Sequence, residues 1–278
     1  MIDLHTHTIA SDGSYSPMEL LQLAEQSQLE AMAITDHDTV AGLVEAEQAA
    51  ETLAVDLVSG VELACQSEVG TMHLLGYFID RGSSGLEDFL GRMVASRQER
   101  NPQIIAKLNE LGYKINMADV QAQAKGPIIS RLHIALAMLG KKYVRSIDEA
   151  FGRFLGDEGS AYVRRIEPAP REAIDLIHQA GGLAVVAHPI HLRASGEPEL
   201  TGRLKELAEA GLDGVEVWYP EHSAQLTDQL WRFCQRSGLA AVGGSDFHGS
   251  AKPHIKLGVG RGSLNIPIEI LYRLKSRL

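Results

Sequence analysis

The chain has 278 residues, a formal net charge of −10 and a hydrophobic content of 45%. That length suits one large α/β domain or two small ones, and the acidic balance argues against a broad nucleic-acid-binding face, although a local basic pocket is compatible with it. The two cysteines form no disulfide or metal-binding pattern, no apolar run reaches transmembrane length, and the first candidate site residue, His5, leaves no room for a removable leader. We therefore expect a cytoplasmic protein with no membrane contact and no obligate protein partner.

The first seven residues predict a short buried strand that ends in two histidines, His5 and His7. Side chains of a strand alternate between its two sides, so these imidazoles point the same way. Asp12 follows in the turn Ser11-Asp12-Gly13. Two imidazoles on one side with a carboxylate nearby favour a metal site, although the H-x-H spacing alone is a weak signal.

Six later segments repeat this pattern, each placing an apolar strand beside a residue that can bind a metal. Strands are expected at 31–35, 57–61, 72–78, 183–187, 214–218 and 240–245, beside Asp36-His37-Asp38, Glu62, His73, His188, His222 and Asp246-Phe247-His248 in that order. Histidines scattered over a surface do not explain this recurrence. It predicts a polynuclear metal centre that draws on His5, His7, Asp12, His37, Glu62, His73, His188, Asp246 and His248.

Capping and stop signals mark helices between the strands. Ser16-Pro17-Met18-Glu19 is a capping box with proline at the first helical position. Further helices are expected at 39–53, 170–180, 198–210 and 223–237, the last three followed by glycine. This alternation predicts a parallel sheet with right-handed crossovers, closed or nearly closed into a barrel whose chemistry lies at the carboxyl ends of the strands.

Residues 84–165 interrupt the alternation. Helical patterns are expected at 86–111, 129–139 and 147–155, and no convincing strand occurs among them. We predict a helical insertion after the fourth strand that sits over the mouth of the barrel. The barrel domain then comprises residues 1–83 and 166–278.

The candidate ligands offer only nitrogen and oxygen atoms, which suits Mn, Fe or Zn and disfavours a thiolate-rich structural site. Asp12, Glu62 and Asp246 together carry about −3, so three divalent ions would leave the centre at about +3, a charge that favours a phosphate ester. Paired metals can clamp the attacking and leaving oxygens and generate hydroxide near neutral pH. No side-chain nucleophile is then needed. We expect manganese, with Fe or Zn as alternatives.

The insertion supplies candidates for substrate contacts. Arg131 can fork onto phosphate oxygens and His133 can protonate a leaving alkoxide, with Ser130 beside them. Arg97 and Arg100 on the long helix are further candidates. An ordinary solvated helix face explains such charges as well, so both interpretations stay open for the arginines.

Three more residues receive provisional roles. His222 follows the strand at 214–218 and is a candidate substrate contact whose role is open. Asp36 is expected to lie behind the metal centre and orient a ligating histidine. Asp38 precedes Thr39 at an expected helix start and is interpreted as a helix cap.

Taken together, these motifs resemble those of the PHP family, the polymerase and histidinol phosphatase phosphoesterases. The matching segments span nearly the whole chain outside the insertion, in the family's order: His5-Thr6-His7, Ser11-Asp12-Gly13, Thr35-Asp36-His37-Asp38, Gly60-Val61-Glu62, His73, Ala187-His188-Pro189 and Gly244-Ser245-Asp246-Phe247-His248. The resemblance implies a distorted (β/α)7 barrel with up to three metals. The first would bind His5, His7, Glu62 and Asp246, the second Asp12, His37 and His248, and the third His73, His188 and a bridging Glu62.

Within that family, the short length, the insertion and the stretch Ser130-Arg131-Leu132-His133-Ile134-Ala135 resemble a bacterial subgroup. That resemblance implies removal of the 3′-phosphate from nucleoside 3′,5′-bisphosphates, for instance conversion of adenosine 3′,5′-bisphosphate to AMP. The alternatives are a 5′-to-3′ exonuclease on short 5′-phosphorylated RNA, a histidinol-phosphate phosphatase, a structural metal-binding module and, more distantly, an amidohydrolase. The complete ligand set argues against an inactive module, and the acidic chain argues against long nucleic acid as the main substrate.

Overall fold

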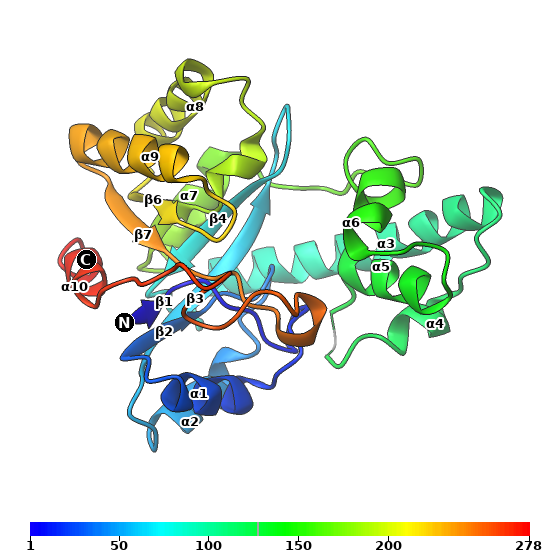
Figure 1. The fold of residues 1–278 in the computed structure, drawn as a ribbon, viewed down its shortest axis with the longest axis horizontal. Coiled ribbons are helices and arrows are strands. Elements are labelled where there is room, and N and C mark those ends of the chain that lie inside the picture. The colour runs from blue at the N-terminus through cyan, green and yellow to red at the C-terminus, as the bar shows by residue number, and fades with distance from the viewer. Residues whose placement is uncertain (127) are drawn as a thin grey trace.

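The computed structural model describes residues 1–126 and 128–278, and its centre is a seven-stranded sheet in the order β1 to β7 (Figure 1). The strands are Ile2–Asp3, Ala31–Ile34, Asp56–Cys65, Met72–Tyr77, Leu183–Val186, Gly214–Trp218 and Ala240–Gly243. The segments that follow β1 and β7 also meet, because the Leu4 amide donates to the Gly243 carbonyl (3.2 Å) and the Asp246 amide to the His5 carbonyl (2.9 Å). The sheet therefore curls into a nearly closed barrel, which confirms the predicted fold class.

One strand breaks the parallel order predicted from the sequence. β4 pairs antiparallel with both β3 and β5, whereas the other neighbouring pairs are parallel. The connection between β3 and β4, residues 66–71, is too short for a crossover helix, so it returns the chain directly. Because β4 runs in the reverse direction, its beginning lies at the barrel mouth. His73 near that beginning thus reaches the same rim as residues that end the parallel strands.

Alternation along the strands divides side chains between the barrel interior and the surrounding helix layer. The interior cluster draws on several strands, with Leu75 on β4 and Val242 on β7 among its members. On β6, Val215 and Val217 pack in the helix layer, which turns Glu216 inward. The interior is therefore a packed core in which one carboxylate is buried.

Helices α1 (Pro17–Gln26), α2 (Leu43–Ala50), α7 (Pro170–Gln179), α8 (Glu197–Glu209) and α9 (Ala224–Ser237) cover the sheet, and 3₁₀ turns follow β5 and β7 at Pro189–Leu192 and Gly249–Ala251. Helix α10 (Glu269–Lys275) packs on the interior cluster, on the side away from the insertion (Figure 1). The predicted capping box of α1 is present, because the Ser16 hydroxyl accepts from the Glu19 amide (3.2 Å) and the Glu19 carboxylate accepts from the Ser16 amide (2.8 Å). Helix α2 is shorter than the predicted 39–53.

The chain between β4 and β5 forms α3 (Ser84–Glu110), α4 (Met117–Gln121), α5 (Arg131–Gly140), α6 (Ile147–Ala150) and a π-helical turn at Phe151–Leu155. With 27 residues, α3 extends for about 40 Å. Its first half joins the barrel core through Phe89 and Met93, and its second half joins a separate cluster through Ile104 and Leu108. Helix α3 thus carries the chain from the end of β4 up to the mouth. Within the described ranges no helix has the length and apolar character needed to span a bilayer.

Candidate active site

Glu62, in β3, is the centre of the candidate metal site. Its two carboxylate oxygens lie between 2.7 and 3.2 Å from ring nitrogens of His5, His7, His37, His73 and His188. Burial alone raises the pKa of this carboxyl group, but the imidazoles of His37, His5 and His73 outweigh it and hold the pKa well below its ordinary value. Glu62 is therefore an ionised carboxylate enclosed by imidazoles, an arrangement suited to a bridging ligand.

Asp12 and Asp246 bring the other predicted ligands to the same point. His248 Nε2 lies 3.3 Å from Asp12 Oδ1, and His7 Nε2 lies 3.2 Å from Asp246 Oδ1. The His248 Nδ1 donates to the Asp246 carbonyl (2.8 Å), which leaves its Nε2 lone pair free to bind a metal. The structure thus brings together all nine residues that the sequence nominated as metal ligands.

This donor set fits divalent metal ions. The nine residues form four overlapping groups whose potential ligand atoms lie within 4.8 Å of one another. Both ring nitrogens of His7 and Nδ1 of His188 are buried and have no hydrogen-bond partner in the described part of the chain. Such orphaned nitrogens cost free energy unless a ligand satisfies them. Because the groups overlap, they do not allot ligands to separate ions, and the three-metal assignment stays a prediction.

Three residues around the centre have backbone conformations that L-amino acids rarely adopt. The φ angle is 28° at His188, 55° at Asp246 and 52° at Asp38, which follows His37. Each such residue costs on the order of 1–3 kcal/mol, and residues of this kind cluster at functional sites. The surrounding contacts must therefore hold these loops in place.

Asp36 supports the loop that carries Asp12. Its carboxylate accepts hydrogen bonds from the Thr8 amide (2.8 Å), the Thr8 hydroxyl (2.7 Å) and the Ser11 hydroxyl (2.6 Å). We expected Asp36 to orient a ligating histidine, but its hydrogen bonds go to this loop instead. Asp36 therefore acts on the site through the position of Asp12.

Asp38 ties the insertion to the barrel. Its carboxylate accepts from the guanidinium groups of Arg97, on α3, and of Arg165, on the segment that returns to the barrel (2.8 Å for Arg165). It also accepts from the Ala64 amide in β3 (3.1 Å). Burial raises the pKa of Asp38, but the charges of Arg165 and Arg97 outweigh it and hold the pKa well below its ordinary value. The interpretation of Asp38 as a helix cap is wrong, because α2 starts later and this carboxylate has other partners.

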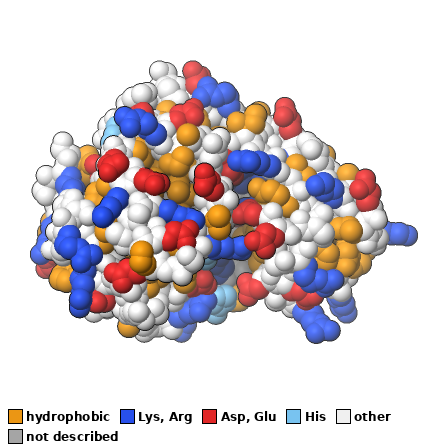
Figure 2. Space-filling model, turned by 90° about the horizontal axis from the view of Figure 1, so that it is seen from above, with side chains coloured by type: hydrophobic (Ala, Val, Ile, Leu, Met, Phe, Trp, Pro, Cys, Tyr) orange, Lys and Arg blue, Asp and Glu red, His pale blue; other side chains and the backbone are white. Residues whose placement is uncertain are grey.

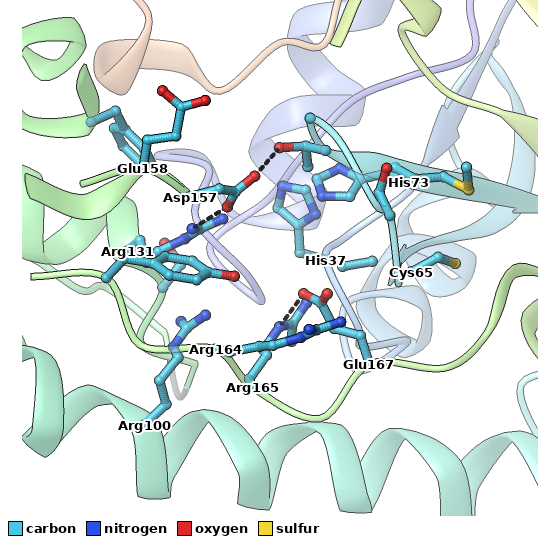
Figure 3. A pocket seen from close by; sticks show the side chains of 18 of the residues that line it. His37, Cys65, His73, Arg100, Arg131, Asp157, Glu158, Arg164, Arg165 and Glu167 are labelled. Carbon is cyan, nitrogen blue, oxygen red and sulfur yellow. Dashed lines mark hydrogen bonds and ion pairs between the residues drawn. The ribbon is translucent and has the colours of Figure 1, made fainter. Parts of the chain in front are cut away.

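A cavity of about 450 Å³ lies between the barrel mouth and the insertion. Figure 3 shows candidate metal ligands on one side of it and a group of guanidinium side chains on the other, namely His37 and His73 facing Arg100, Arg131, Arg164 and Arg165. Some of these charges are paired, because Arg131 lies 3.4 Å from Asp157 and Arg165 lies 3.1 Å from Glu167. The cavity nevertheless presents more positive than negative groups opposite the metal ligands.

Arg100 differs from the other arginines of this cavity. It is 4% exposed, its NH2 donates to Asn101 Oδ1 (3.3 Å), and its buried Nε has no partner among the described residues. Burial and the nearby charges of Arg131 and Arg97 lower its pKa. A buried guanidinium without an acid is costly unless an anion compensates its charge. A solvated helix face is therefore the wrong interpretation for Arg97 and Arg100, both of which are buried.

Ser130, Arg131 and His133 lie at the start of α5. The Ser130 amide donates to His133 Nδ1 (3.0 Å), so the neutral ring carries its proton on Nε2. Burial lowers the pKa of His133, and Asp12 and His248 lie close enough to act on it electrostatically. Arg131 lines the cavity while its NH1 donates to a backbone carbonyl of the insertion (3.0 Å). This helix start thus faces both the arginines and the metal ligands.

His222 lies apart from this group. It does not line the cavity, its Nδ1 donates to the Val217 carbonyl (2.9 Å), and its ring centroid is 5.2 Å from that of Tyr219. The predicted substrate contact of His222 therefore gains no support from the structure and stays open.

Four contacting side chains were not nominated from the sequence. Glu216, Tyr219 and Lys252 contact predicted site residues at 2.6 to 3.1 Å, and Arg165 contacts Asp38 at 2.8 Å. The sequence could have marked Glu216, because it is an acidic residue in the middle of an apolar strand and a buried acid needs a partner. Tyr219 and Lys252 both contact Asp246 Oδ2 from loops, where the sequence carries no periodic signal.

Residues 3–179 match the family model described as the PHP domain, more than half of the chain. The chain belongs to the PHP domain family. In a crystal structure of a candidate metal-dependent phosphoesterase from Bifidobacterium adolescentis, the same fold recurs with a TM-score of 0.88 and 29% identity, over 99% of this chain and 96% of that one. The clustered side chains described above are able to bind metals, as a metal-dependent phosphoesterase of this family requires.

Relatives of this PHP protein differ in the phosphate esters that their names specify. It is 34% identical to a 5′-3′ exoribonuclease of Haemophilus influenzae, over 88% of this chain and 89% of that protein. It is 30% identical to a phosphoribosyl 1,2-cyclic phosphate 1,2-diphosphodiesterase of Eggerthella lenta, over 91% and 97%. It is 31% identical to a 3′,5′-nucleoside bisphosphate phosphatase of Chromobacterium violaceum, over 89% and 87%. These similarities support metal-dependent hydrolysis of phosphate esters and leave the substrate to be argued from the site.

Proposed function

We propose that this PHP protein removes the 3′-phosphate from nucleoside 3′,5′-bisphosphates such as adenosine 3′,5′-bisphosphate. The observation that carries the proposal is the cavity in which the candidate metal ligands face arginines, with Arg100 buried and without an acidic partner among the described residues. A substrate with two phosphates matches these two kinds of anion site. The relative from Chromobacterium violaceum that carries this activity in its name supports the choice.

The nine clustered residues around Glu62 would hold up to three divalent ions, with manganese as the first candidate and Fe or Zn as alternatives. Ions of this kind polarise a phosphoryl oxygen and activate water. The ionised carboxylates of Asp12, Glu62 and Asp246 offset the positive charge of the centre. What remains for the rest of the chain is to bind the ester, align it and stabilise the leaving oxygen.

The insertion performs those tasks in the proposal. Arg100 and Arg131 bind the 5′-phosphate, with Ser130 at the start of α5 beside them, while Arg97 adds positive charge from its pair with Asp38. His133 donates a hydrogen bond from Nε2 to the leaving 3′-oxygen, because its Nδ1 is already engaged by the Ser130 amide. The second phosphate takes no part in the chemistry, so its binding free energy can align the ester over the metal ligands.

Comparison of adenosine 3′,5′-bisphosphate with 3′-AMP tests this two-site arrangement. Loss of the 5′-phosphate should lower kcat/KM by about 10²-fold or more, since one charge-assisted contact contributes about 1.5–3 kcal/mol and two arginines are available. Arg131→Ala or Arg100→Ala should shrink the preference by lowering activity on the bisphosphate selectively. Arg92→Ala, an exposed arginine on the same helix as Arg100, is the control and should leave the preference unchanged. Equal kcat/KM for both substrates in the wild type would reject the proposal, and a clear preference for histidinol phosphate would replace it.

The second candidate function is 5′-to-3′ exonuclease activity on short 5′-phosphorylated RNA. It is favoured by the similarity to the exoribonuclease of Haemophilus influenzae and to one of Escherichia coli named Rnm, which is 32% identical over 92% of this chain. The same arginine site would bind the 5′-terminal phosphate. Trinucleotides with and without that phosphate separate the two functions: cleavage of the phosphorylated RNA as fast as the bisphosphate would make the exonuclease the main activity.

A further inference from the structure

Glu216, in the middle of β6, contacts two of the clustered histidines at once. Its Oε1 accepts from Nδ1 of His5 (3.0 Å), and its Oε2 accepts from the backbone amide of His188 (2.6 Å). Glu216 is 0% exposed, and it belongs to none of the groups of potential metal-ligating atoms among the described residues. It therefore lies directly behind the metal site without being part of it.

The charge of Glu216 has no ordinary counter-ion. In the described part of the chain its one ion-pair partner is the ring of His5, and no lysine or arginine approaches it. A buried carboxylate that meets only an imidazole and a backbone amide is costly to maintain. A cation bound on the far side of His5 would supply what is missing, and a carboxylate behind an imidazole makes that imidazole a stronger ligand.

The contact with Glu216 also fixes which nitrogen of His5 can bind a metal. Because Nδ1 donates to the carboxylate, the neutral ring keeps its lone pair on Nε2, the nitrogen that lies 3.2 Å from Glu62 Oε2 and faces the candidate metal site. His248 is held in the same tautomer by a neutral backbone carbonyl, that of Asp246. Among the clustered histidines of the described chain, His5 alone has a carboxylate from outside the cluster on its other nitrogen.

The second contact fixes a strained backbone. His188 has φ of 28° and ψ of 65°, outside the conformations that histidine ordinarily adopts. The amide of this residue donates to Glu216, and its ring then reaches Glu62 Oε1 at 2.9 Å. Without the carboxylate, the chain after β5 is free to relax and to turn the ring away from Glu62.

We propose that Glu216 is a positioning residue of the metal centre: it sets the tautomer of His5 and the backbone of His188, so that these two candidate ligands from different strands both approach Glu62. This inference rests on the metal-binding part of the proposed function and is independent of the substrate.

Glu216→Gln tests the inference with little change of shape. A carboxamide has one acceptor oxygen, so its NH2 must face either His5 Nδ1 or the His188 amide. If the NH2 group faces His5, it favours the tautomer with a proton on Nε2, which blocks metal binding at that nitrogen. If it faces His188, two N–H donors point at each other and the hydrogen bond to the His188 amide is lost. We expect apparent metal affinity to fall by about 10- to 100-fold, as measured by Mn²⁺ retained in dialysis against graded chelator concentrations.

Two further measurements separate positioning from a general loss of structure. Glu221→Gln removes the same charge from the loop after β6, where Glu221 pairs with Arg261 (2.7 Å), and should retain wild-type metal affinity. Nitrogen NMR of the metal-free protein should show Nδ1 of His5 protonated in the wild type and this signal lost in Glu216→Gln. If Glu216→Gln does not fold, Glu216→Asp keeps the charge on a shorter side chain and should weaken metal binding to an intermediate degree.

Wild-type metal affinity in Glu216→Gln, or in a folded Glu216→Asp together with an unchanged His5 signal, would overturn the proposal. Both readings are made without substrate, so they stand even if the bisphosphate assignment fails.

Discussion

At the scale of single residues, the site depends most on Glu62, whose carboxylate approaches five imidazole rings. We expect Glu62→Ala, Asp12→Ala and Asp246→Ala each to abolish turnover while the protein stays folded, because these side chains face the mouth rather than the apolar core. Metal content should fall most for Glu62→Ala, since that carboxylate is shared between ligand groups. Metal analysis of the purified variants, with circular dichroism as the folding control, measures both effects.

The outcome that contradicts this prediction is near wild-type activity in variants that have lost their metal. Asp36→Asn is an informative companion, because Asp36 holds the loop of Asp12 without facing the ligands. It should weaken metal binding less than Asp12→Ala does.

The pH dependence of kcat can report the protonation state of the His133 ring. We expect His133→Ala to lower kcat by roughly 10²–10⁴-fold with a smaller change in KM, because the imidazole acts on the leaving oxygen. Burial holds its pKa below the ordinary value of a histidine, which favours the neutral ring that donates through Nε2. The ratio of wild-type to variant kcat should therefore stay constant above neutral pH and fall as pH decreases through that lowered pKa, where protonation of Nδ1 breaks the bond from the Ser130 amide.

A ratio that instead rises as pH decreases would show that the charged imidazolium is the active form and that His133 transfers a proton. His133→Gln provides the matched comparison, because its amide can replace Nε2–H without an ionisable ring. It should recover part of the lost kcat and show no pH dependence of its own.

At the scale of elements, Asp38 connects the barrel to both ends of the insertion. Asp38→Asn removes the carboxylate that pairs with Arg97 and leaves Arg165 with Glu167 alone, and loss of one partner of such a buried pair costs about 3–5 kcal/mol. We expect a lower free energy of unfolding in urea and a higher KM for the bisphosphate, because both arginines line the cavity.

The control for Asp38→Asn is Glu47→Gln, which removes a carboxylate from the exposed pair with Arg81 (3.0 Å). Exposed pairs contribute about 0–1 kcal/mol, so this variant should unfold almost like the wild type. Equal stabilities of the two variants would show that Asp38 does not hold the insertion.

The elements also show what sequence patterns can and cannot predict. The barrel and the gathering of the candidate ligands were predictable because most of these residues lie in or just after an apolar strand, and an apolar strand is a local signal. The direction of β4 was not, because alternation in a short strand is the same in either direction and only the six-residue connection at 66–71 reveals the reversal. The burial of Arg97 and Arg100 was hidden for a different reason: their partners, Asp38 and the cavity, come from parts of the chain that only the fold brings to α3.

At the scale of the whole molecule, α3 joins two hydrophobic clusters in one continuous helix. The insertion is therefore held over the mouth by a rigid element at one connection and by Arg165 at the other. The cavity of about 450 Å³ between them has room for a nucleotide and is bounded by the insertion, whereas extended polymers need an open track.

The charge of the molecule adds a limit on substrate length. The net charge is −10, and on the face shown in Figure 2 positive and negative side chains are interspersed without a continuous basic track. Affinity for long RNA comes from neutralising many phosphates, so lengthening the substrate beyond the cavity should add little.

We expect kcat/KM for 5′-phosphorylated RNA to be no higher for a 20-mer than for a trimer. With about two or three phosphates bound, the slope of log affinity against log salt should be near −2 or shallower for both lengths, since single strands contribute about −0.7 per phosphate. Steady-state kinetics on both substrates between about 50 and 200 mM salt, the range over which counter-ion release is measurable, test this expectation. A 20-mer that is preferred more than tenfold and shows a much steeper slope would mean that RNA binds along a surface outside the cavity.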